Sequence, residues 1–189
     1  GLPAVYAGRS TGMLDLALHP QFAQNRLVYF TYHKGLGGEN FTLALGRGRY
    51  DGNGFTDVKE LWAGDAMRTG GSRLVFGRDG LIYITVGGAA RQPASKETTS
   101  DAGKVIRLKD DGTVPSDNPF VGKNGSKPEI YTVGHRDHHG LAVHPGSGQI
   151  FHAELGPIGG DKINILKPGA NYGWPDVGYG RDNDGSPMP

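Results

Sequence analysis

The feature that most constrains the fold of this chain is a strand–turn–strand unit that occurs three times. In each unit, a short run with period-two apolar residues is followed by a turn and a second run rich in β-branched and aromatic residues, as in LDLAL, HPQFAQN and RLVYFTY. Leu16, Leu74 and Leu141 take equivalent places in the three units and lie 58 and 67 residues apart. Such a pattern predicts strands, and Asp79-Gly80 predicts a tight hairpin turn in the second unit.

Each repeat has room for about four strands, of which the fourth in the first repeat is predicted to be short, at residues 59–62. A four-stranded unit that recurs with a hairpin at its start is typical of a β-propeller blade. We therefore expect an all-β fold with about three four-stranded blades, at about 14–62, 72–133 and 140–189, the last incomplete. Three blades do not close a ring, so residues 1–189 are expected to form a single partial-propeller domain. Its open edges would permit edge-to-edge self-association.

The composition argues against several classes of function. The chain has 20 basic and 19 acidic residues and a net charge of +1, so no basic surface for nucleic acid is predicted. It has no cysteine, which excludes disulfides and thiolate metal sites. No apolar run approaches the roughly 20 residues of a membrane span. The 33 glycines and 12 prolines are spread along the chain and indicate turns between strands, not a disordered tract.

Polar residues are densest between residues 134 and 175, where His135-Arg136-Asp137-His138-His139 forms a predicted turn and His144 and His152 follow. These histidines suggest a zinc site, but the first three share one turn, where they cannot all face one ion. We therefore do not expect a histidine metal site. Arg136 is open to two interpretations: it binds a ligand, or it pairs with Asp137 or Glu154.

Several blocks in one order carry a resemblance to a known family: MLDLALHPQFAQNRLVYFTY (13–32), SRLVFGRDGLIYITVG (72–87), GKVIRLKDDGTVPSDNPF (103–120), YTVGHRD (131–137), GLAVHP (140–145) and GPIGGDKINILKPGANYGWP (156–175). With them the chain resembles the soluble aldose sugar dehydrogenases, also called the glucose/sorbosone dehydrogenase family. The resemblance covers nearly the whole chain. It implies part of a six-bladed β-propeller that holds pyrroloquinoline quinone and calcium, and a parent protein that is longer at both ends.

The resemblance also implies site residues. The family's Gly-His-Arg-Asn turn, whose arginine and asparagine hold the quinone, is matched by residues 134–137, so Arg136 and Asp137 are the expected cofactor-binding residues. An arginine can grip a carboxylate or quinone oxygen with two donors. Asp137 replaces the asparagine and adds a negative charge near a tricarboxylate cofactor. The carbonyls of Gly156 and Pro157 match the family's calcium ligands, and calcium prefers oxygen ligands.

Three further positions depart from the family pattern. The family's catalytic histidine corresponds to Thr69, whose hydroxyl cannot act as a general base near neutral pH. The carboxylate that supports that histidine is replaced at Gly88, and a glutamine of the first glycine-rich loop is replaced at Ser10. The catalytic base is therefore unassigned, with Asp65 and Asp137 as the nearest carboxylates in the sequence.

The function that the resemblance implies is oxidation of an aldose or related alcohol, with hydride transfer to the quinone and assistance from calcium. The substrate would be a small sugar, and the parent enzyme is expected in the periplasm or outside the cell. The departures at Thr69 and Gly88 support two alternatives. One is a non-catalytic propeller that binds carbohydrate or protein, and the other is an inactive fragment of the dehydrogenase.

Overall fold

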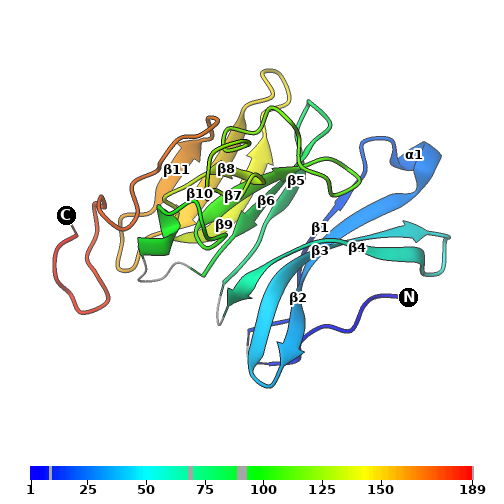
Figure 1. Ribbon diagram of the computed structural model, residues 1–189, viewed down its shortest axis with the longest axis horizontal. Helices are drawn as coiled ribbons and strands as arrows, with labels where there is room; N and C mark the ends of the chain where they lie inside the picture. The colour runs from blue at the N-terminus through cyan, green and yellow to red at the C-terminus, as the bar shows by residue number, and fades with distance from the viewer. Residues whose placement is uncertain (9, 68–69, 89–92, 189) are drawn as a thin grey trace.

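The computed structural model describes residues 1–8, 10–67, 70–88 and 93–188. These residues form three antiparallel sheets with almost no helix (Figure 1). The first sheet has the order β1-β2-β3-β4, the second β5-β6-β7-β8 and the third β11-β10-β9. The predicted all-β fold is confirmed, and three sheets side by side are the arrangement of a partial β-propeller.

The strands of the first sheet are β1 (Met13–Leu18), β2 (Leu27–Gly37), β3 (Asn40–Tyr50) and β4 (Phe55–Met67), with the short helix α1 (Phe22–Asn25) between β1 and β2. The second sheet contains β5 (Leu74–Phe76), β6 (Ile82–Val86), β7 (Lys104–Leu108) and β8 (Ile130–Thr132), with the 3-10 turn η1 (Pro93–Ser95) before β7. The third contains β9 (Asp137–Val143), β10 (Ile150–Leu155) and β11 (Lys162–Ile165).

The first strands of the sheets lie next to one another, because β1 contacts β5 and β5 contacts β9. Two side chains join them: Asp15 Oδ2 accepts a hydrogen bond from the backbone N–H of Leu74 at 2.9 Å, and Arg73 Nε donates to the carbonyl of His139 at 3.0 Å. The first bond joins the first sheet to the second, and the second bond holds the start of β9, with the polar residues around it, against the second sheet.

The core lies between the sheets. Strand β6 is buried along its whole length, because its alternate residues enter two different clusters. Ile82 and Ile84 pack with residues of the first sheet, whereas Tyr83 packs toward the third. A strand covered on both faces reads as a continuous apolar run, which is the pattern of IYITV. The turn before it forms as predicted, with Gly80 at φ 76° and Tyr83 Oη donating to Asp79 Oδ2 at 2.8 Å.

Two predicted elements differ from the structure. The fourth strand, predicted at residues 59–62, is β4 and runs over Phe55–Met67. Three register shifts interrupt its pairing with β3, so its alternation is broken and the sequence pattern recovers only its centre. The predicted histidine-rich turn is also partly strand, since β9 already begins at Asp137.

The outer faces of the first and third sheets carry exposed apolar residues, including Leu16 at 64% exposure and Ile163 at 79%. The first and third sheets are therefore the two ends of the row of sheets, and no further sheet in the described residues packs on these side chains. Within the described residues, no helix has the length and apolar character needed to cross a membrane.

Candidate functional site

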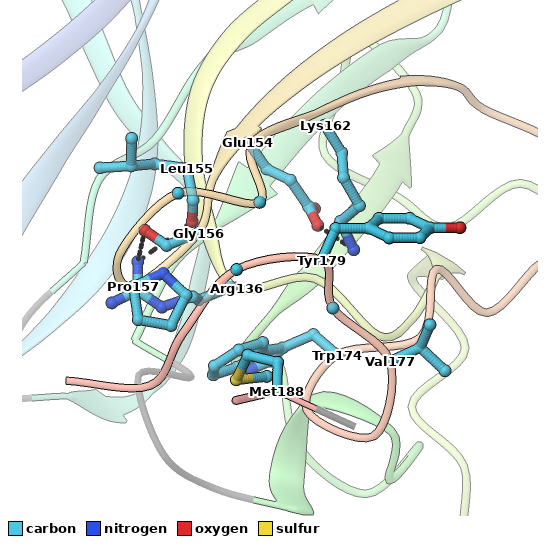
Figure 2. A pocket seen from close by; sticks show the side chains of 14 residues that line it. Arg136, Glu154, Leu155, Gly156, Pro157, Lys162, Trp174, Val177, Tyr179 and Met188 are labelled. Carbon is cyan, nitrogen blue, oxygen red and sulfur yellow. Dashed lines mark hydrogen bonds and ion pairs between the residues drawn. The ribbon is translucent and has the colours of Figure 1, made fainter. Parts of the chain in front are cut away.

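The pairing of β9 with β10 brings Arg136 to the bend that follows β10. Asp137 is paired with Leu155, so Arg136 lies beside residues 155–157. Its Nη1 donates to the carbonyl oxygens of Leu155 at 3.0 Å and Gly156 at 3.1 Å (Figure 2). The structure therefore brings Arg136 and Gly156 into direct contact, although the resemblance assigns one to the quinone and the other to calcium.

The bend at Gly156 depends on glycine. A Cβ on Gly156 would lie 2.0 Å from the carbonyl oxygen of Gly159, and Gly159 and Gly160 adopt φ values of 69° and 75°. These are left-handed conformations that glycine adopts without strain. Asp161 closes the bend by accepting a hydrogen bond from the N–H of Gly156 at 3.0 Å. The carbonyls of this segment are thus held toward Arg136 by local sequence.

Trp174 forms the other wall of the site. The guanidinium carbon of Arg136 lies 5.4 Å from the centre of its ring, and the ring is 5% exposed. The backbone N–H of Trp174 donates to the carbonyl of Gly134 at 2.9 Å, and the backbone carbonyl of Trp174 accepts from Ser95 Oγ at 2.8 Å. Arg136 is therefore held between an aromatic face and two carbonyls, an arrangement that fixes a guanidinium in orientation.

A small cavity lies at this point (Figure 2). Its walls include Arg136, Glu154, the 155–160 bend and Trp174, and the segment from Val177 to Gly180 closes it together with Met188. Its volume is about 10 Å³, which is space for about one water molecule. Arg136 Nε is buried and has no hydrogen-bond partner in the structure. The site therefore offers one unused charged donor but little enclosed space.

The charges near Arg136 decide between the two interpretations of its role. Asp137 pairs with His139 instead, with Asp137 Oδ2 3.5 Å from His139 Nε2 and both side chains about half exposed. Glu154 pairs with Lys162, whose Nζ lies 2.7 Å from Glu154 Oε1. Arg136 is thus held by backbone carbonyls and Trp174, and not by an ion pair with Asp137 or Glu154.

Behind Arg136 lies a buried polar cluster made of His135, His138, His152 and Glu154, each at most 3% exposed. His135 Nδ1 lies 2.8 Å from Glu154 Oε2, and His138 Nδ1 lies 2.8 Å from His152 Nε2. Burial lowers the pKa of all three histidines, that of His152 to about 3, so the rings are neutral at pH 7. Burial pushes the pKa of Glu154 up, but the hydrogen bond from His135 and the Lys162 ion pair outweigh it and lower the pKa.

The first three histidines do not all face one point, since His139 is exposed and lies outside the cluster, as does His144. His135 and His138 do approach each other, and strand β10 supplies the partners that were not predicted for them, His152 and Glu154. The alternation of His152 and Glu154 on a predicted strand was a signal for this, because residues two apart point to the same face.

The other predicted positions lie elsewhere or outside the described residues. Thr69 falls among the residues that the structure does not describe. Gly88 has φ 92° and offers no carboxylate. Asp65 is engaged away from Arg136: its carboxylate accepts from Lys127 Nζ at 2.8 Å and from the N–H of Asp101 at 3.0 Å. The ion pair with Lys127 helps to lower the pKa of Asp65 against the opposing effect of burial, so Asp65 is a structural carboxylate.

Comparison with known proteins finds close relatives along the whole chain. The family model described as glucose/sorbosone dehydrogenase matches residues 1–189. The aldose sugar dehydrogenase YliI of Escherichia coli (strain K12) is 37% identical over 195 residues, which cover 100% of this chain and 53% of that protein.

Solved structures agree with the sequence comparison. A crystal structure of a glucose dehydrogenase superposes with a TM-score of 0.92 at 39% identity, covering 100% of this chain and 56% of that one. The PQQ-bound aldose sugar dehydrogenase of Streptomyces coelicolor superposes with a TM-score of 0.79 at 28% identity, covering 99% of this chain and 55% of that one. The chain therefore spans about half the length of the relatives that it matches.

Proposed function

Since the chain belongs to the glucose/sorbosone dehydrogenase family, we propose that it is part of a quinone-dependent dehydrogenase that oxidises an aldose or a related alcohol. The observation that carries this proposal is the convergence of Arg136 with the bend at Gly156 at one end of the third sheet. The ends of strands on a rigid β scaffold are where binding groups are commonly placed.

Arg136 is the residue that we propose for the quinone, together with Asp137. The chemistry of Arg136 fits pyrroloquinoline quinone, because its buried Nε has no partner and can donate to an anionic oxygen. The cavity of about 10 Å³ in residues 1–189 does not enclose three fused rings. One oxygen of the cofactor would instead enter this cavity to reach Arg136 Nε, while its rings lie outside the cavity, where the remaining half of the family's length completes the site.

Calcium at Gly156 and Pro157 fits less well. Carbonyl oxygens suit calcium, but the Gly156 carbonyl already accepts a hydrogen bond from the guanidinium of Arg136. A divalent cation at that oxygen would lie beside a second positive charge, which is unfavourable in a partly buried site. Calcium binding at Gly156 is therefore opposed by the charge of Arg136 as long as the guanidinium stays on this carbonyl.

When bound, the quinone supplies the hydride acceptor. Oxidation of a hydroxyl-bearing carbon also releases the hydroxyl proton, which a side chain must accept. We assign this role to His139, which is exposed and lies next to Asp137. Asp137 would stabilise the imidazolium that forms, the task that a carboxylate performs beside a histidine base. This pair would replace the base that is missing at Thr69.

A non-catalytic carbohydrate- or protein-binding propeller remains the second candidate. It is favoured by the absence of a carboxylate at Gly88 and by the closed state of the cavity at Arg136. A periplasmic or secreted location and edge-to-edge self-association through the end sheets belong to the proposal as well. Exposed apolar side chains on the end sheets, such as Ile163, support self-association.

The proposal is tested by reconstituting the full-length protein and measuring dye reduction with a panel of aldoses. We expect reduction only when pyrroloquinoline quinone is present, and a loss of turnover in His139→Ala without a loss of quinone binding. Quinone binding without turnover on any aldose would favour the second candidate. No binding of quinone at all would exclude the dehydrogenase.

A further inference from the structure

The buried cluster behind Arg136 has a feature that ordinary core packing does not require. Its hydrogen bonds fix the tautomers of two histidines, one after the other. His138 Nε2 lies 3.0 Å from the carbonyl oxygen of Val86. A carbonyl only accepts, so Nε2 must carry the proton, and Nδ1 of the neutral His138 is an acceptor.

The tautomer of His152 follows from that of His138. His152 Nε2 lies 2.8 Å from His138 Nδ1, so this Nε2 must donate. The ring is fully buried, and no carboxylate of the described residues lies within hydrogen-bond distance of Nδ1. The charged form is therefore disfavoured, and His152 Nδ1 carries a lone pair. The nearest donor to it is Asn164 Nδ2, at the long distance of 3.4 Å. His152 is 0% exposed, so bulk water does not reach this lone pair.

The lone pair faces negative charge. Glu154 Oε2 lies 3.8 Å from His152 Nδ1, too far for a hydrogen bond and with no proton between the two atoms. Two acceptors buried face to face are unfavourable unless a positive group lies between them. Lys162 does not fill this place, since its Nζ is bound to the other oxygen of Glu154 and to the carbonyl of Tyr172 at 2.9 Å.

His135 also lies next to the carboxylate of Glu154. Its Nδ1 lies 2.8 Å from Glu154 Oε2, and its Nε2 lies 2.9 Å from Thr132 Oγ1. A hydroxyl can donate or accept, so Thr132 supports either tautomer of His135. If the proton of the ring moves to Nε2, Nδ1 becomes a ligand atom and no net proton is lost. His135, His152 and Glu154 each offer one ligand atom, and these three atoms lie within 4.8 Å of one another. Nδ1 is the nitrogen that faces Glu154 Oε2 in both rings, at 2.8 Å for His135 and 3.8 Å for His152.

We propose that His135 Nδ1, His152 Nδ1 and Glu154 Oε2 bind one first-row divalent transition-metal ion, with Zn²⁺ as the reference. Two imidazoles and one carboxylate are a ligand set that suits zinc, at bond lengths of about 2.0–2.2 Å. Small movements of the side chains bring the ligand atoms to this geometry. The cavity of about 10 Å³ that Glu154 also lines has room for one water as a fourth ligand.

The surroundings match those of a metal site. Histidine ligands commonly donate their second ring nitrogen to a fixed acceptor, and here His138 accepts from His152 while Thr132 serves His135. The ion would join the turn before β9 to strand β10, directly behind Arg136. It is distinct from the calcium expected at Gly156, because imidazole nitrogen is a poor ligand for calcium. The proposal does not depend on the enzymatic function.

The test is a titration of the chelator-treated full-length protein with Co²⁺, followed by its visible absorption and by competition with Zn²⁺. We expect one ion per chain, displaced by Zn²⁺ but not by Ca²⁺. In His152→Ala, binding should fall by at least ~100-fold, and in His138→Phe by ~10–100-fold as for loss of a supporting partner. His144→Ala is the matched control, because His144 lies on an exposed turn with Ser147, and it should bind as the wild type does.

A measurement on the wild type covers the case in which His152→Ala fails to fold. With ¹¹³Cd²⁺ and ¹⁵N-labelled histidine, scalar coupling of the metal to Nδ1 of His135 and His152 is the expected result. Absence of binding to the wild type would overturn the proposal, as would coupling to His139 or His144 instead. Either result would leave the cluster as a hydrogen-bonded core.

Discussion

Arg136 Nη1 lies 3.1 Å from the carbonyl oxygen of Gly156. The side chain expected to hold the quinone thus donates a hydrogen bond to the backbone oxygen expected to hold calcium. In this arrangement the guanidinium occupies the position next to the bend where a metal cation would bind. Quinone binding by Arg136 and cation binding by the Gly156 carbonyl are therefore coupled through one hydrogen bond.

Replacing Arg136 with methionine should therefore strengthen cation binding in the absence of quinone. Loss of the positive charge and of its hydrogen bond frees the Gly156 carbonyl, and we expect about tenfold tighter binding of a calcium analogue. Terbium luminescence excited through Trp174 measures this directly. Arg181→Met is the control, since Arg181 also donates to a carbonyl, that of Gly185 at 2.9 Å. Equal terbium affinity in Arg136→Met and wild type would disprove the coupling.

Asp137→Asn should tighten quinone binding. The substitution removes a negative charge from the side of a tricarboxylate cofactor and restores an amide donor. At a half-exposed position the repulsion between two like charges costs ~1 kcal/mol, which corresponds to about fivefold in quinone affinity. The same variant leaves His139 without its carboxylate, so turnover at saturating quinone should fall. Fluorescence titration and steady-state rates separate the two effects, and an unchanged affinity would remove Asp137 from the site.

The stability of the protein should fall as the pH falls below 6.5. The buried histidines have folded-state pKa values below the unfolded value, because burial disfavours the charged ring. The unfolded chain then binds more protons, and each such histidine lowers the free energy of unfolding by up to ~1.4 kcal/mol per pH unit. For His152 this window extends from about 6.5 down to about 3. Urea unfolding in metal-free buffer between pH 7.5 and 5 checks it, and a flat profile would show that the rings are not buried as described.

Gly156→Ala should destabilise the bend. The new Cβ would lie 2.0 Å from the carbonyl oxygen of Gly159, so the backbone must shift, at a cost of about 1–3 kcal/mol. Gly54→Ala is the matched control, because nothing lies within 4 Å of the position that its Cβ would take. Thermal unfolding of both variants compares the two sites. A Gly156→Ala protein as stable as Gly54→Ala would indicate a looser bend than the structure shows.

The fold followed from the sequence because its signals are local. Period-two apolar runs and the Asp79-Gly80 turn mark strands and hairpins wherever they occur. Strand β4 was predicted too short because its register shifts against β3 hide the alternation. The contact between Arg136 and Gly156 followed from the family resemblance, and no spacing rule would have given it.

Spacing along the chain could place His152 and Glu154 on one face of a strand, but it could not show which histidines lie opposite them. The histidine cluster depends on the register of β9 against β10, where a shift between Ala153 and Glu154 places His138 opposite Glu154. A register is set by pairing across the sheet, and one residue of slip would turn every side chain to the other face. Counting histidines within one turn therefore missed the partners that a neighbouring strand supplies.

The central claim is that Arg136 and the bend at Gly156 form the quinone site, and equilibrium binding of pyrroloquinoline quinone to the cofactor-free full-length protein tests it most directly. We predict saturable binding to the wild type and to Arg181→Leu, and binding at least ~10-fold weaker to Arg136→Leu, because a charge-assisted pair is lost. Equal affinity in Arg136→Leu and the wild type, or no binding to the wild type, would contradict the claim.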